Sequence, residues 1–192
     1  MFGSIELVKP LRLASLTRFV RIRRVDVSAH WSVLLISVLI LMGALHAPLT
    51  SLVGLTSYLG VLLLHECGHV IAAQRLHCDV LAVELYPVFA ITRFETPRTR
   101  FDHCLIAWGG VLAQFTVAIP LVIWVAVFGY TRFNAVNAAL AIWGFFSLGV
   151  ALFNLLPVGP LDGAIAWGLI PALFKRPKKP PVRPRNDRGS WR

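Results

Sequence analysis

Two histidines with a glutamate between them stand in an apolar stretch of the chain. The stretch contains His65-Glu66-Cys67-Gly68-His69, which is the pattern H-E-x-x-H. At 3.6 residues per helical turn, His65 and His69 lie one turn apart on one face, so two imidazole nitrogens can converge on one zinc ion. Glu66 points to the next face, where its carboxylate can take a proton from a water at the open coordination position. The pattern predicts a hydrolytic zinc site.

A catalytic zinc takes three protein ligands, so a third must come from elsewhere in the chain. Of the nine acidic residues, only Glu66 and Asp162 are embedded in apolar sequence. Asp162 follows a stretch rich in Pro and Gly at 157–160. Such residues break a helix and free backbone groups, which a membrane tolerates only beside protein or a watery cavity. Two roles are open for Asp162: third metal ligand, or N-cap of a short helix over 163–174.

The composition places this motif in a membrane. Hydrophobic residues make up 57% of the chain and charged residues 15%, against about 25% charged residues in a soluble domain. Charge within a membrane is costly and usually functional, which weakens the alternative that the motif only lines a helix–helix contact. Four apolar runs predict transmembrane helices, and all but the first exceed the roughly 20 residues that cross a bilayer. The runs cover residues 31–45, 51–73, 104–130 and 135–157.

The expected fold class is an all-α polytopic membrane protein with about four transmembrane helices. A fifth apolar run over 161–174 is too short to span and predicts a half-helix. Polar and apolar residues alternate over 19–27, and the stretch 80–94 is rich in Val, Ile, Tyr and Phe. Both patterns predict small strands at the cytoplasmic membrane face. An extended substrate could pair with an edge strand from 80–94.

The basic residues are unevenly distributed. With four spans, the loops at 46–50 and 131–134 share one side, and Arg132 is the only one of 19 Lys and Arg residues there. This asymmetry predicts that both termini lie in the cytoplasm. The expected location is the bacterial cytoplasmic membrane, as an integral protein. The net charge of +10 could suggest a nucleic-acid partner. The sequence shows no pattern of a nucleic-acid-binding fold, so no such partner is expected. An Arg-rich, acid-poor start leaves an organellar transit peptide open.

Three segments are expected. Residues 1–24 form a basic cytoplasmic segment, 25–174 form the intramembrane core, and 175–192 form a disordered basic tail. The three cysteines have no metal-binding or disulfide spacing. The sequence assigns neither an oligomeric state nor a particular substrate.

These motifs resemble those of the site-two proteases, a family of intramembrane zinc metalloproteases. The two family patterns appear as H-E-x-x-H at 65–69 and as N-x-x-P-x-x-x-x-D-G at 154–163. The similarity extends over about residues 21–174. It corresponds to a minimal core, without the PDZ domain or the nucleotide-sensing CBS domains that some members carry.

The resemblance implies one zinc ion held by His65, His69 and Asp162. It also implies that Glu66 is the general base for attack by zinc-bound water on a peptide bond. The expected activity is that of a zinc metalloendopeptidase, and the expected partners are a transmembrane protein substrate and the lipid bilayer. Asn154, in the second motif, is a candidate substrate-binding residue.

The chain departs from the family pattern in its central helix. The family carries G-P-x-x-N there, with an asparagine that helps to hold the substrate carbonyl, whereas this chain has Gly110 for Pro and Ala113 for Asn. Gln114 is adjacent and is a second candidate substrate-binding residue, although one residue is about 100° around a helix. The departures leave open a non-catalytic metal-binding member that binds membrane helices. A metal transporter, in which the charged residues within the membrane form a transit site, is a further alternative.

Overall fold

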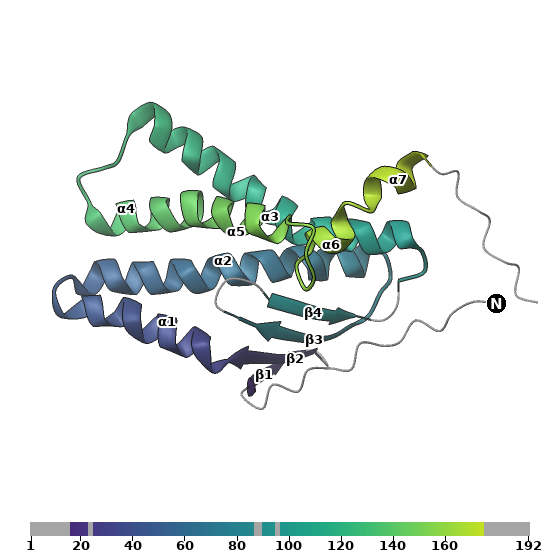
Figure 1. Ribbon diagram of the computed structural model, residues 1–192. Helices are drawn as coiled ribbons and strands as arrows, with labels where there is room; N and C mark the ends of the chain where they lie inside the picture. The colour runs from purple at the N-terminus through teal and green to yellow at the C-terminus, as the bar shows by residue number, and fades with distance from the viewer. Residues whose placement is uncertain (1–15, 23–24, 87–89, 95–96, 175–192) are drawn as a thin grey trace, which may run out of the picture.

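A computed structural model describes residues 16–22, 25–86, 90–94 and 97–174 of the chain. Helices form a layered bundle, and a small sheet lies beside one end of it (Figure 1). The elements in chain order are β1 (Leu16–Ile22), β2 (Val25–His30), α1 (Trp31–Met42), a 3-10 turn (Gly43–Leu45), α2 (Pro48–Arg75), β3 (Val80–Leu85), β4 (Ala90–Phe94), α3 (Arg100–Phe128), α4 (Asn134–Leu140), a π-helical segment (Ala141–Phe146), α5 (Ser147–Asn154), α6 (Gly163–Ala166) and α7 (Leu169–Phe174). The predicted fold class, helical and polytopic with small strands, is confirmed.

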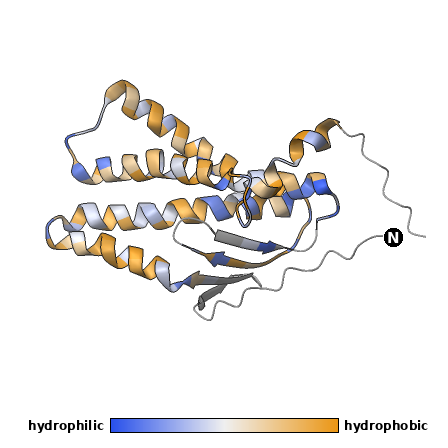
Figure 2. Cartoon of the chain, in the orientation of Figure 1, coloured by the Kyte–Doolittle hydropathy of each residue, from blue (hydrophilic) through white to orange (hydrophobic). Residues whose placement is uncertain are grey.

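Three helices are long and apolar enough to cross a membrane: α2, α3, and the continuous helix over Asn134–Asn154. The expected first span is shorter, because α1 and the following 3-10 turn cover only Trp31–Leu45. At the rises of these helices it reaches about 24 Å, against a hydrocarbon core of about 30 Å. Hydrophobic residues cover most of the helices, and hydrophilic ones gather at the turn before α4 and the start of α3 (Figure 2).

The predicted strands are confirmed, and they join into one sheet of order β1-β2-β3-β4. The outer pairs are antiparallel, while β2 and β3 run parallel, with Val27 opposite Val83. Parallel strands need a long crossover, and the α1–α2 hairpin supplies it. The sheet includes β1 (Leu16–Ile22), which lies before residue 25, where the core was predicted to begin. The predicted tail at 175–192 and residues 87–89, which connect β3 and β4, lie outside the described residues.

The helices α2 and α3 cross with their backbones in contact. A Cβ atom on Gly109 would lie 2.6 Å from the carbonyl oxygen of Gly68, and one on Gly68 would overlap the carbonyl of Gly109. Small residues at a crossing allow such close approach in a membrane. The crossing lies inside the H-E-x-x-H segment, so it brings α3 directly against the two histidines.

Candidate metal centre

The structure brings the three predicted ligands together. The Nε2 atoms of His65 and His69 lie 3.0 Å apart, and Asp162 Oδ2 lies 2.9 Å from the first and 3.2 Å from the second. These three residues form a group that could hold a metal ion. Donor atoms around a tetrahedral zinc with bonds of 2.0–2.1 Å lie about 3.3 Å apart, so the two imidazoles and one carboxylate fit such an ion in spacing and chemistry.

Asp162 stands at the N-terminus of α6, but its side chain makes no capping hydrogen bond there. Its carboxylate faces the two imidazoles instead, and the side chain is 20% exposed. The backbone carbonyl of Asp162 accepts hydrogen bonds from Ile165 and Ala166. Of the two roles left open by the sequence, N-cap and ligand, the geometry therefore disfavours side-chain capping and leaves the carboxylate free for a ligand role.

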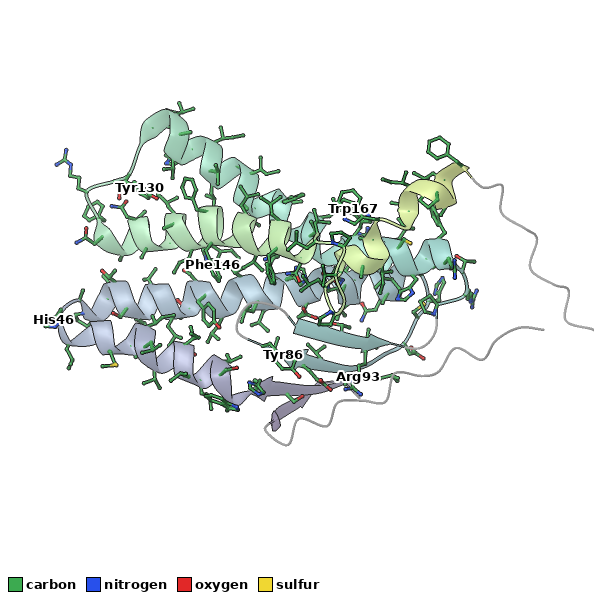
Figure 3. All side chains as sticks on the ribbon, viewed as in Figure 1. His46, Tyr86, Arg93, Tyr130, Phe146 and Trp167 are labelled. Carbon is green, nitrogen blue, oxygen red and sulfur yellow. The ribbon has the colours of Figure 1, made fainter. Side chains whose placement is uncertain are left out.

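Two tryptophans hold the segment that carries this carboxylate. The indole N–H of Trp108, on α3, donates to the carbonyl of Ala166 at 3.0 Å, and that of Trp167 donates to the carbonyl of Leu155 at 2.6 Å. The two indole rings meet edge to face, with centroids 5.7 Å apart. Trp167 is labelled in Figure 3, beside the yellow-green α6. The sequence did not predict these two contacts. The signal for them was the preference of an indole N–H for a hydrogen-bond acceptor, which held even though Trp167 is 41% exposed.

Each histidine has a partner on α3 for its second ring nitrogen. His69 Nδ1 lies 2.8 Å from the carbonyl oxygen of Ile106, and His65 Nδ1 lies 2.9 Å from Gln114 Oε1. Metal-binding histidines usually donate from the second nitrogen in this way, which fixes the ring orientation. A backbone carbonyl leaves no trace in a sequence, so the partner of His69 could not have been predicted.

Glu66 is buried beside the ligands, with 3% of its surface exposed. The hydroxyl of Thr92, on β4, donates to Glu66 Oε2. The other carboxylate oxygen, Oε1, is buried and has no hydrogen-bond partner among the described residues. One oxygen is therefore anchored to the sheet, and the other is available to a proton donor.

The hairpin that supplies Thr92 makes an ion pair between its own strands and a ring contact with the end of β2. Arg93 and Glu84 form a cross-strand ion pair of 2.8 Å, and the ring of Tyr86 stacks on His30 with centroids 5.3 Å apart. Burial raises the pKa of the Tyr86 phenol, and the nearby Glu84 charge adds to this while Arg93 partly opposes it. Tyr86 and Arg93 are labelled in Figure 3. These contacts give the strand beside Glu66 a defined position.

The two candidate substrate-binding residues differ in their surroundings. Gln114 lies at His65, as described above. Asn154 is buried, and its amide N–H donates to the carbonyl of Val150, one turn earlier in α5. This bond ties Asn154 to its own helix, and its role in substrate binding stays a prediction.

The departure at Gly110 has a steric reason. A Cβ atom at this position would lie 2.5 Å from His69 Nε2 and 2.8 Å from His65 Cε1. Real Cβ atoms essentially never approach other atoms so closely, so any side chain here would displace the imidazoles. The absence of a side chain at Gly110 lets α3 approach both rings.

We expect Gly110→Ala to weaken zinc binding by at least about 10-fold, because the added methyl group pushes the two rings apart and disturbs a set of ligands whose orientation matters. Zinc affinity measured by competition with a chelator checks this. Gly149→Ala is the matched control, since a Cβ at Gly149 meets nothing within 4 Å. Equal zinc affinity in Gly110→Ala and wild type would contradict the geometry.

Comparisons with known proteins follow this geometry. No family model matches the chain, and no curated protein matches it in sequence. Among solved structures, it is similar to the Site-2 Protease from Methanocaldococcus jannaschii, with a TM-score of 0.64 and 20% sequence identity over 82% of this chain and 72% of that chain. The resemblance to the site-two proteases predicted from the motifs is thus confirmed at the level of the fold.

Proposed function

We propose that this chain, which has the fold of a site-2 protease, is an intramembrane zinc metalloendopeptidase that cleaves transmembrane proteins. One observation carries the proposal. Two imidazole nitrogens and a carboxylate oxygen converge within 3.2 Å, although the carboxylate comes from a segment 97 residues away from the first histidine. The buried Glu66 follows His65 directly in the sequence, and its Oε1 atom has no hydrogen-bond partner in the described part of the chain.

His65, His69 and Asp162 would hold the zinc ion. When bound, zinc acts as a Lewis acid that polarises a carbonyl and lowers the pKa of a water to about 7. Glu66 accepts the proton of the attacking water at Oε1 as the carbon–oxygen bond forms. It then delivers that proton to the amide nitrogen as the carbon–nitrogen bond breaks. Thr92 holds Oε2, so the carboxylate stays aimed throughout.

The surroundings of the site suit a peptide bond inside a membrane. A helical substrate must unwind to be cut, because its amides are shielded by their own hydrogen bonds. The strand β4 is at the edge of the sheet and reaches Glu66 through Thr92. An unwound substrate pairing with that edge by strand addition would therefore run beside the general base.

Cleavage of a model transmembrane peptide in reconstituted vesicles tests this function. We expect zinc-dependent product formation by the wild-type chain, and no zinc uptake into sealed vesicles. A chain that binds zinc and the peptide without cutting it would be a non-catalytic binding protein. Zinc accumulation inside the vesicles without cleavage would identify a transporter. Either of these two results would overturn the proposal.

We also propose that both termini face the cytoplasm. His46 and Tyr130 lie at one end of the bundle, and Arg93 lies toward the other (Figure 3). Among the 19 Lys and Arg residues, only Arg132 belongs to the loops at the first end, and basic residues mark the cytoplasmic side. The membrane core would comprise residues 25–174, flanked by basic segments.

Cysteine labelling of intact cells tests this orientation. In a chain without its native cysteines, His46→Cys and Asn134→Cys should react with an impermeant reagent added from outside. Ser190→Cys, in the basic tail, should react only after the membrane is opened. Labelling of Ser190→Cys in intact cells would reverse the assignment.

A further inference from the structure

One face of α3 supports both histidines through three successive turns. Ile106, Gly110 and Gln114 are four residues apart, so they lie on the same side of the helix. Ile106 offers its carbonyl oxygen to His69 Nδ1, Gly110 leaves room for both rings, and Gln114 offers Oε1 to His65 Nδ1. The two histidines thus have equivalent partners, one from the backbone and one from a side chain.

The chemistry of the site decides how the Gln114 amide is used. If His65 binds a metal through Nε2, its proton must be on Nδ1, because a ring nitrogen that carries a proton has no lone pair to give. Nδ1 then needs an acceptor. The amide oxygen of Gln114, at 2.9 Å, is that acceptor. The opposite orientation of the amide would place a donor against the Nδ1 proton and is incompatible with metal binding.

The other half of the amide points to the same conclusion. Gln114 is completely buried, and its Nε2 has no hydrogen-bond partner among the described residues. Burying an unpaired N–H is unfavourable. An apolar residue at position 114 would avoid the cost of a buried N–H without a partner. The presence of an amide there therefore indicates a favourable contact elsewhere on the same side chain. In the structure, that contact is between its oxygen and His65.

The preceding residue cannot take this role. Ala113 lies at the crossing of α2 and α3, where a Cβ on Gly68 would be 2.8 Å from the Ala113 Cβ. A longer side chain at 113 would compete with the close approach of the two helices. Gln114, about 100° further around α3, faces the ligands instead. The polar side chain of this helix therefore lies at position 114, one residue after the position of the family's asparagine. It points in a different direction around the helix.

We propose that Gln114 is a positioning residue that holds His65 in the tautomer and orientation needed to bind zinc through Nε2. This inference rests on the proposed function of the site as a zinc centre. It differs from the role in substrate binding that the sequence predicted for Gln114, because its primary contact is a metal ligand and not the substrate.

The test compares the zinc affinity of purified wild-type protein with that of three Gln114 variants. Gln114→Met keeps the length and removes the acceptor, and Gln114→Asn keeps the amide but is one methylene too short to reach. Both should lose about 10–100-fold in zinc affinity, the usual effect of removing such a partner. Gln114→Glu keeps an acceptor at the same length, and its zinc affinity should stay close to that of the wild type.

Ser147→Ala is the matched control, because it removes another fully buried polar atom that has no hydrogen-bond partner among the described residues. Its zinc affinity should equal that of the wild type. The d–d absorption spectrum of cobalt-loaded protein gives a second readout: it should change in Gln114→Met and be restored in Gln114→Glu.

Two results would overturn the inference: unchanged zinc affinity in Gln114→Met and Gln114→Asn, or an equal loss in Gln114→Glu and Gln114→Met. The second result would mean that the shape of the side chain matters and its acceptor does not. A wild-type protein that binds no zinc is a different outcome, since it would overturn the proposed function itself and the inference with it.

Discussion

Replacing Glu66 with glutamine should abolish measurable cleavage of a transmembrane peptide while zinc stays bound. Glutamine has nearly the same shape and can still accept a hydrogen bond from Thr92, but it cannot take a proton from water. A general base contributes roughly 10²–10⁴-fold to a rate, so the cleavage rate should fall by at least about 100-fold. Product formation and zinc content, measured on the same purified sample, check both halves of this expectation.

Thr92→Val is the informative companion to Glu66→Gln. It removes the hydroxyl that donates to Glu66 Oε2 but leaves the carboxylate, so cleavage should slow less than in Glu66→Gln. If Glu66→Gln cuts at the wild-type rate, another group takes the proton and the mechanism is wrong. If Glu66→Gln loses its zinc, Glu66 is a ligand and not only a base.

Replacing any one of His65, His69 and Asp162 with alanine should remove both zinc and activity. Each change leaves two protein ligands where a catalytic zinc takes three. Metal analysis after dialysis should give close to one zinc per wild-type chain and little in the variants.

Controls of the same residue types separate this effect from general damage. His46→Ala and Asp79→Ala alter exposed residues outside the candidate ligand group, and both should keep their zinc. A variant of Asp162 that retains a full equivalent of zinc would show that the ligand set is different. The contrast with Glu66→Gln, which should lose activity alone, distinguishes the base from the ligands.

The sequence predicted most of the architecture because membrane constraints leave strong patterns. Runs of 20 or more apolar residues located α2, α3 and the helix over Asn134–Asn154. Alternation and β-branched residues located the strands. The sequence did not predict that the two strand pairs form one sheet. The parallel pairing of β2 with β3 depends on how the α1–α2 hairpin between them folds back.

The candidate site was predicted from residues that stand out against an apolar background. His65 and His69 are set by helical spacing, and Asp162 was the only other embedded carboxylate apart from Glu66. The supporting contacts were not predictable in the same way. The carbonyl of Ile106 has no sequence signal, and the contact of Gln114 with His65 depends on the exact rotation of α3 at its crossing with α2.

The steric role of glycine at the site also required the structure. In the sequence, Gly110 is the loss of a proline from the family pattern. In the structure, the imidazole rings of His65 and His69 lie where a side chain at position 110 would be. Gly68 and Gly109 similarly mark a backbone contact that a sequence pattern alone does not distinguish from other small residues in a membrane helix.

The most direct test of this account is a zinc titration of the metal-free protein in vesicles that contain the model transmembrane peptide. We expect no cleavage without metal, a rise in rate as zinc is added, and a plateau at one equivalent per chain. Glu66→Gln should take up the same equivalent and stay inactive. Cleavage that persists in the metal-free protein, or no cleavage at full zinc occupancy, would contradict the assignment of this site as a zinc protease.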